Sequence, residues 1–106
     1  MESTAGNKRY TRFRDFYPFY LSEHADRTNR RLHFVGTSVS GLIIITAIAT
    51  GRPWLLLVAL VVGYTCAWVG HFRFERNRPA TFKHPFYSFI GDWVMWRDII
   101  TRRIPF

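Results

Sequence analysis

The feature that most constrains this chain is a long central stretch that is almost free of charge. The chain carries 15 Lys and Arg and 7 Asp and Glu residues, but only Arg52 among them lies between Phe34 and Phe72. The mean hydropathy of -0.06 resembles that of a soluble protein only because charged flanks offset this apolar centre. Since about 20 apolar residues let a helix cross a bilayer, the stretch predicts two apolar helices joined by a turn.

These two segments predict a helical hairpin that crosses a membrane twice. The spans cover residues 34–50 and about 54–72, with a turn at Gly51-Arg52-Pro53 that places the proline first in the second helix. The first helix is expected to begin near Asp26 or Thr28, both good N-cap residues. Seven Lys or Arg residues precede the first span and seven follow the second, so both termini are predicted in the cytoplasm. The membrane would be a bacterial inner membrane or one of the endoplasmic reticulum type.

Amphipathic segments flank the hairpin on both sides. Aromatic residues recur at helical spacing from Tyr10 onward, and apolar residues do so between about 85 and 103. Both segments are predicted as short helices at the membrane interface, with the aromatic residues of the first in the headgroup region. Residues 1–9 are polar and are expected to be disordered. The predicted fold class is an all-α integral membrane protein with one membrane-embedded domain over residues 1–106, an antiparallel two-span hairpin and two amphipathic interfacial helices. The alternative is a soluble bundle with an unusually apolar hairpin.

Composition excludes several other classes. The single cysteine, Cys66, cannot form an intramolecular disulfide or a cysteine-rich zinc site. The net charge of +8 is typical of nucleic-acid binding, but basic residues that flank apolar spans fit an anionic membrane surface better. We therefore expect membrane lipids and no nucleic acid as partners. Small residues at four-residue spacing, Gly36 and Ser40 on the first span and Gly63 and Ala67 on the second, favour close helix packing within the hairpin. The oligomeric state stays open, a homo-oligomer included.

The four histidines all belong to one end of the predicted hairpin. His33 and His71 are equally far from the turn at Arg52, so an antiparallel hairpin places them at the same depth. His24 and His84 lie in the flanks on the same, cytoplasmic side. A histidine at the edge of an apolar span is costly without a partner, which makes His71 a functional candidate. A single interfacial histidine, however, commonly bonds only to water or lipid headgroups.

Asn29 and Glu75 lie one helical turn further toward the same end. They are four residues from His33 and His71, so each pair shares a helix face. Imidazoles with a carboxylate suit iron(II), zinc, manganese or another divalent ion, with Glu75 as a ligand or as the acceptor behind His71. Glu75 could instead pair with an arginine, and Asn29 could cap a helix or bond to backbone. Asp92 could pair with an arginine or face the site.

Two segments of the chain resemble a known family of small membrane proteins. They are Phe16-Tyr-Pro-Phe-Tyr-Leu-Ser-Glu-His24-Ala-Asp-Arg-Thr-Asn29-Arg-Arg-Leu-His33 and Trp68-Val-Gly-His71-Phe-Arg-Phe-Glu75-Arg-Asn-Arg-Pro79-Ala80. The resemblance extends from about Phe13 to the C-terminus, and its most specific part is the Val-Gly-His-x-x-x-Glu-x-x-x-Pro-Ala pattern. The characterised fungal member of this family is a 2-hydroxy fatty acid dioxygenase of the endoplasmic reticulum.

The resemblance implies an iron(II)-dependent oxidation in which O2 converts a 2-hydroxy fatty acid into the fatty acid one carbon shorter. By motif, the metal ligands of the family carry over onto His24, His33 and His71, and less directly onto His84 and Glu75. Glu75 joins the first three as a catalytic residue. The fungal protein has more transmembrane sequence between its histidine segments, so the reaction type carries over better than the substrate chain length.

A fatty-acid or lipid substrate would lie with its tail along the apolar helices and its carboxylate at the interface. Basic and polar side chains near the histidines are candidates for binding that carboxylate. They are Arg30, Arg31, Arg73 and Asn29.

Two other functions stay open at this point. A membrane scaffold or assembly protein without chemistry would hold no metal, and its histidines would not need to converge. A zinc-dependent lipid hydrolase could use the same histidine cluster and would remain active without O2. Di-iron hydroxylases and desaturases need clustered histidine boxes, and four histidines are too few for them.

Overall fold

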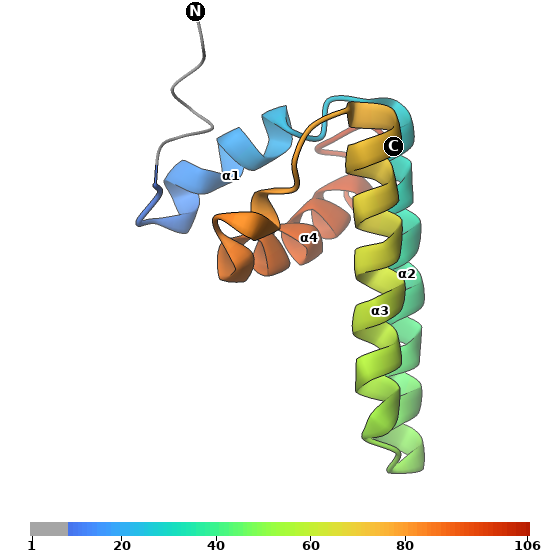
Figure 1. Cartoon of the computed structure of the whole chain (residues 1–106). Coiled ribbons are helices and arrows are strands. Elements are labelled where there is room, and N and C mark those ends of the chain that lie inside the picture. Colours follow the sequence, from blue (N-terminus) through green and yellow to red (C-terminus); the bar gives the residue numbers. More distant parts are fainter. Residues whose placement is uncertain (1–8) are drawn as a thin grey trace, which may run out of the picture.

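The computed structural model describes residues 9–106, and the described part of the chain contains helices and no strands. Two long helices, α2 (Arg27–Thr50) and α3 (Trp54–Val69), form an antiparallel hairpin. Two shorter helices, α1 (Phe13–Ser22) and α4 (Pro85–Ile100), lie beside the end of the hairpin that is opposite the turn (Figure 1). The molecule is therefore a long hairpin with a second layer of helices at one end only.

The expected disorder of residues 1–9 concerns a segment that, apart from Arg9, lies outside the described residues.

Local sequence signals define the two ends of α2. The Asp26 side chain accepts a hydrogen bond of 2.9 Å from the backbone N–H of Asn29, which is the N-cap predicted near this position. At the other end, Gly51 has a left-handed backbone with φ of 63°, which glycine adopts without steric cost. Pro53 is the N-cap of α3, one residue before the predicted position. These signals make the turn tight and the hairpin antiparallel.

Small residues allow α2 and α3 to approach closely, as their spacing predicted. A Cβ atom on Gly36 would lie 2.7 Å from the Cβ atom of Cys66, which is closer than two carbon atoms can come. One turn further, the Ser40 hydroxyl stands against Gly63 and donates a hydrogen bond of 2.8 Å to the carbonyl of Ala59. This packing fixes the two helices relative to each other, and with them the depth of residues near their ends.

The second span was predicted to be helical to about residue 72, but the α-helix ends at Val69. It continues into a π-helical turn, η1 (Gly70–Glu75), after which Arg76 adopts a left-handed backbone with φ of 60°. A π-helical turn is wider than an α-helical turn and redirects the side chains that it carries, and such turns are frequent at functional sites. A loop with a short 3-10 turn, η2 (Ala80–Phe82), then leads to α4.

The main core lies between α1 and α4 rather than inside the hairpin. Phe16 and Tyr20 of α1 pack against Met95 and Ile99 of α4, and all four are buried. This corrects the prediction that the aromatic residues of α1 face lipid headgroups, because Phe16 and Tyr20 are 0% and 1% exposed. Gly91 explains the contact, since a Cβ atom there would lie only 3.0 Å from the Tyr20 ring.

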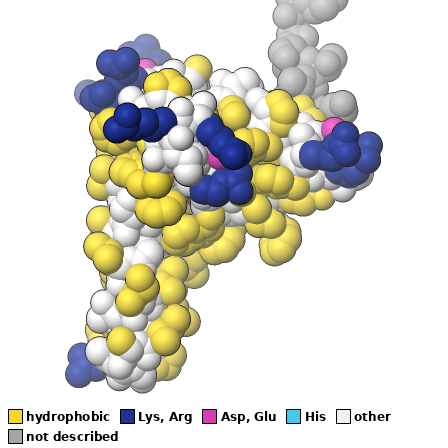
Figure 2. All heavy atoms as spheres, turned by 180° about the vertical axis from the view of Figure 1, so that it is seen from behind, with side chains coloured by type: hydrophobic (Ala, Val, Ile, Leu, Met, Phe, Trp, Pro, Cys, Tyr) yellow, Lys and Arg dark blue, Asp and Glu magenta, His cyan; other side chains and the backbone are white. Residues whose placement is uncertain are grey.

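Apolar side chains cover the hairpin along its length. Figure 2 shows them between the Lys and Arg side chains at the end that carries α1 and α4 and the single basic side chain at the tip of the hairpin, which is that of Arg52. The helices Arg27–Thr50 and Trp54–Glu75 are both long and apolar enough to cross a membrane. Only 28% and 22% of their most apolar 18-residue segments are buried. Exposed residues such as Leu42, Ile48 and Leu57 contribute to this surface. The structure thus confirms an all-helical fold with two helices of membrane-spanning length.

Candidate metal centre

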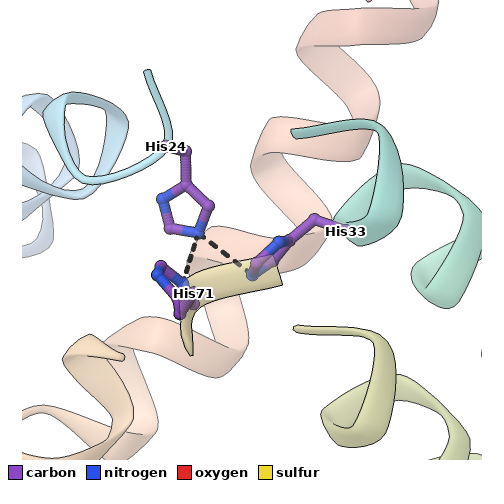
Figure 3. A group of neighbouring side chains, drawn as sticks. All are labelled: His24, His33 and His71. Carbon is purple, nitrogen blue, oxygen red and sulfur yellow. Dashed lines mark hydrogen bonds between the residues drawn. The ribbon is translucent and has the colours of Figure 1, made fainter. Parts of the chain in front are cut away.

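Three histidines from three different segments meet where the hairpin adjoins α1 and α4 (Figure 3). His24 lies in the loop after α1, His33 in the second turn of α2, and His71 in η1, and all three are buried. The Nε2 atom of His24 is 3.0 Å from that of His33 and 3.1 Å from that of His71. Their ligand atoms lie within 4.8 Å of one another, so the group could hold one metal ion.

The second nitrogen of each ring, Nδ1, faces an oxygen atom that can only accept a hydrogen bond. The proton of each neutral ring therefore lies on Nδ1, and Nε2 carries a lone pair. The pairs are His24 with the Tyr20 carbonyl at 2.6 Å, His33 with the Asn29 carbonyl at 3.0 Å, and His71 with the Asn77 side-chain Oδ1 at 2.6 Å.

Three nitrogen lone pairs thus converge without a proton between them. Burial lowers the pKa of His24 well below its ordinary value, and the neighbouring His33 and His71 lower it further. The His24 ring therefore stays neutral and does not place a proton between the three nitrogens. A cation between the rings would satisfy all three nitrogens. Two imidazole nitrogens bound to one ion at about 2.1 Å and at a right angle are about 3.0 Å apart, which is the separation of His24 Nε2 from each of the other two nitrogens. The residues present therefore fit a divalent metal ion.

Asn29 and Glu75 connect the start of α2 to the end of η1. The Asn29 Nδ2 atom donates a hydrogen bond of 3.0 Å to Glu75 Oε1, and the backbone N–H of Asp26 donates one of 2.8 Å to the same oxygen. The structure thus places in contact two residues for which the sequence predicted equal depth. Because the Asn29 carbonyl accepts from His33, Glu75 acts on the histidine group through Asn29.

Glu75 itself stands outside the histidine group, contrary to the expectation of a ligand or of an acceptor behind His71. The acceptor behind His71 is Asn77 instead. The π-helical turn and the left-handed Arg76 are the physical reason, because they bring the chain back so that the Asn77 N–H bonds to the His71 carbonyl at 3.0 Å. The Asn77 Nδ2 atom also donates hydrogen bonds of 3.1 and 3.2 Å to Glu23, which fixes its orientation.

The structure does not bring His84 into the group, which corrects its prediction as a ligand. Its Nε2 atom accepts a hydrogen bond of 2.9 Å from the backbone N–H of Tyr10. The ring packs against Phe16 and Tyr87, with centroid separations of 5.3 and 6.2 Å. His84 immediately precedes α4, and the contact of α4 with α1 places it among these aromatic residues.

The three arginines predicted to bind a substrate carboxylate are placed elsewhere. Arg30 donates hydrogen bonds to three backbone carbonyls, including that of His24 at 3.1 Å, and so supports the loop that carries this histidine. The Arg31 guanidinium lies 4.7 Å from the centre of the Phe106 ring. Arg73 is exposed on η1. None of the three lines the cavity that adjoins the histidines.

That cavity has a volume of about 240 Å³ and runs from His33 between α2, α3 and α4. Its lining is mostly apolar, and within residues 9–106 it includes no Lys or Arg. Asp92 of α4 faces the cavity. Of the two predicted possibilities, an ion pair with an arginine or a position facing the site, the structure shows the second. Burial raises the pKa of Asp92 to about 7, so its carboxyl group is partly protonated near neutral pH.

Tyr20 connects Asp92 to the histidine group. Its hydroxyl donates a hydrogen bond to Asp92 Oδ1, and its ring stacks on that of His24 with centroids 4.1 Å apart. Its carbonyl is the acceptor for His24 Nδ1.

The geometry agrees with a comparison to protein families. The sequence model of the Mpo1-like family, described as 2-hydroxy-palmitic acid dioxygenase Mpo1-like, matches residues 10–104. The chain belongs to the Mpo1-like family. The match includes both histidine segments and therefore confirms the resemblance seen in the sequence. No curated protein and no solved structure matched the chain.

Sequence reasoning missed two residues that orient the histidines of this Mpo1-like protein. Tyr20 lies four residues before His24, so helical spacing in α1 is a signal that could have identified it. Asn77 lies six residues after His71, a spacing that no regular helix brings together, and only the π-helical turn and the following loop place it there.

Proposed function

We propose that this Mpo1-like protein is an iron(II)-dependent dioxygenase that converts a 2-hydroxy fatty acid into the fatty acid one carbon shorter. The observation that carries the proposal is the convergence of three buried Nε2 atoms at the head of an apolar cavity. A site with three nitrogen ligands leaves coordination positions open for a substrate. An amphiphilic acid requires such a polar centre directly beside an apolar surface, and the description of the family supports this substrate class.

His24, His33 and His71 would hold the ion through their Nε2 atoms. Iron(II) bound there supplies electrons for O2 and open positions for the hydroxyl and carboxylate of the substrate. The protein orients the three rings, because an oxygen behind each Nδ1 fixes the tautomer and raises the basicity of Nε2. The overall reaction needs no other reductant, because one 2-hydroxy acid and one O2 give one shorter acid, one carbon dioxide and one water, with all atoms accounted for. The bond between the carboxyl carbon and the hydroxyl-bearing carbon breaks, and the latter becomes the new carboxyl carbon.

Asp92 would contribute a hydrogen bond at the wall of the cavity. An ionised Asp92 would repel a substrate carboxylate, and the described lining offers no Lys or Arg to offset this. A protonated Asp92 donates a hydrogen bond to that carboxylate instead. The Tyr20 hydroxyl occupies Oδ1, which leaves Oδ2 for the proton.

We further propose that α2 and α3 cross a membrane with both termini on the cytoplasmic side. Helices of 24 and 22 residues are about 36 and 33 Å long, which suffices for a hydrocarbon core of about 30 Å. The exposure of their apolar side chains, which is unfavourable in water, supports a lipid environment. The basic flanks favour the proposed orientation, with Arg52 on the far side and the histidine group at the cytoplasmic interface.

Metal analysis of single variants tests the metal centre. Purified wild-type protein is expected to bind one equivalent of iron(II), whereas His33→Ala and His71→Ala lose at least about tenfold in affinity. His84→Ala is the matched control, because His84 is also buried but lies outside the group. If both ligand variants retain full metal, the proposed centre is wrong.

O2 uptake with 2-hydroxypalmitate tests the reaction. The iron-loaded protein is expected to consume O2 and to release pentadecanoic acid and carbon dioxide in equal amounts. An iron-loaded protein that consumes no O2 with any 2-hydroxy acid would refute the dioxygenase. Activity on lipid esters with zinc and without O2 would point to a hydrolase, and a folded protein that holds no metal would point to a scaffold.

A further inference from the structure

The cavity below His33 has two chemically different ends. His33, Thr37 and Asp92 place nitrogen and oxygen atoms at the end next to the metal centre. Ile44 and Leu56 form the opposite end, deep in the hairpin. The distance along α2 from His33 to Ile44 is about 16 Å at 1.5 Å per residue. The cavity is thus elongated, with one polar and one apolar end.

The wall that the hairpin contributes is made of small residues. Ser40, Ala59, Gly63 and Ala67 line it. Small side chains in a row leave a groove along the two helices. The volume of about 240 Å³ lies below the range of about 300–1,000 Å³ that is typical of ligand pockets, so the groove has room for a single slender ligand.

Helix α4 covers the polar end of this groove through Phe89, Asp92 and Trp93, and the Trp93 ring would lie 3.6 Å from a Cβ atom on Gly41. Ile44 and Leu56 at the apolar end belong to the hairpin. There Leu56 and Leu60 are 44% and 46% exposed. The cavity is therefore open to the side, on the same apolar surface of the hairpin that we propose to face lipid.

We propose that this cavity binds one acyl chain that enters sideways from the lipid phase. The carboxyl end reaches His33 and Asp92 under α4, and the chain passes Gly63 and leaves past Leu60 toward the lipid. The site takes a free 2-hydroxy acid and excludes a lipid with two chains, because the groove has room for one. The identity of the headgroup rests on the proposed function, whereas binding of the chain requires no reaction.

Photo-crosslinking in the full-length, metal-loaded protein tests the site directly. The probes are two 2-hydroxypalmitate derivatives with a diazirine near the carboxyl end or near the methyl end, in phosphatidylcholine vesicles. The first is expected to label the polar end, at Thr37 or Trp93, and the second Leu56 or Leu60. An excess of unmodified 2-hydroxypalmitate should abolish labelling by both probes. Labelling that is absent, or that is spread over outward residues such as Leu57 and does not compete, overturns the proposal.

A pair of tryptophan variants on α3 sharpens the test. Leu60→Trp fills the side opening with a residue that is half exposed and so leaves the fold intact, and it is expected to lower labelling by the methyl-end probe about tenfold. Leu57→Trp places the same side chain on the outward face, where Leu57 is 67% exposed, and should leave labelling unchanged. If the methyl-end probe labels the two variants equally, the proposal that the chain enters from the side past Leu60 is wrong.

The outcomes separate this proposal from the proposed function. Competed labelling at the expected positions without O2 uptake would retain the chain site and refute the dioxygenase. O2 uptake with diffuse labelling that does not compete would retain the dioxygenase and overturn the chain site. The kinetics of 2-hydroxyoctanoate cleavage add a second readout, because this shorter chain is expected to end before it reaches Leu60. Leu60→Trp should therefore raise KM for 2-hydroxypalmitate and not for 2-hydroxyoctanoate.

Discussion

Replacing Asp92 by Asn should remove a pH dependence of stability that this buried carboxyl group imposes. Burial raises the pKa of Asp92 from 3.8 to about 7, although the hydrogen bond from Tyr20 opposes the rise. Between these two values the folded protein holds a proton that the unfolded chain releases. The free energy of unfolding therefore falls as the pH rises from about 4 to about 7, and the full loss is present above that range.

The raised pKa of Asp92 sets the size of the effect. A change from 3.8 to about 7 corresponds to about 4 kcal/mol, which is an upper bound because the carboxyl group faces a cavity. Asn has nearly the same shape, cannot ionise and still accepts the hydrogen bond from the Tyr20 hydroxyl. Asp92→Asn is therefore expected to match wild type near pH 4 and to exceed its stability by up to about 4 kcal/mol at pH 8.

Denaturant unfolding of the metal-free protein in detergent, followed between pH 4 and pH 8, measures this difference. Asp15→Asn is the matched control, because Asp15 is an exposed aspartate on α1 and should leave the pH dependence of wild type unchanged. If wild type and Asp92→Asn lose stability in parallel as the pH rises, burial of Asp92 is not the cause. If the variant is in addition less stable by the same amount at every pH, the hydrogen bond between Tyr20 and Asp92 stabilises the fold, and ionisation of Asp92 does not limit stability.

Substitutions at Asn77, Glu75 and Gly70 examine how the proposed metal centre is supported. Asn77→Ala removes one acceptor behind the histidines and should weaken metal affinity by about 10–100-fold in a chelator competition, with unchanged helix content by circular dichroism. Glu75→Ala leaves the buried amide of Asn29 without its acceptor and should cost about 1–3 kcal/mol of unfolding free energy, whereas Glu75→Gln keeps the oxygen and should cost less. Gly70→Ala would place a Cβ atom 2.1 Å from Asn29 Oδ1 and should lower both stability and metal affinity, while Gly41→Ala, with 3.6 Å to its nearest neighbour, should be tolerated. Similar effects of the two glycine variants would contradict the close contact at Gly70.

The hairpin could be predicted from the sequence because its signals are local or depend only on distance from the turn. A single charge at Arg52 between two apolar segments indicates where the chain reverses, and Asp26 and Gly51 are ordinary helix-ending residues. An antiparallel hairpin then places His33 and His71 at equal depth. Two of the three histidines therefore follow from helix geometry and the position of the turn alone.

The third histidine could not be identified from spacing, because its position depends on tertiary contacts. His24 and His84 both lie in loops on the same side of the predicted hairpin, and nothing in their spacing separates a ligand from a ring that packs among aromatic residues. An aromatic helix face also looks the same in sequence whether lipid or another helix covers it, so the burial of Phe16 and Tyr20 was missed. The π-helical turn at His71 likewise has no sequence signal that distinguishes it from an α-helix.

These contacts suggest a division of tasks between the two layers of the molecule. The hairpin alone aligns only His33 and His71, because His24 follows α1 and is held by the Tyr20 ring, the Tyr20 carbonyl and Arg30. The core between α1 and α4 therefore does more than stabilise the fold. It brings the third nitrogen to the two that the hairpin provides, and through Asp92 the same core forms the wall beside the metal centre. Because Ile44 and Leu56 at the other end of the groove belong to the hairpin, the layer that completes the proposed metal centre leaves that end open toward the surface that we propose to face lipid.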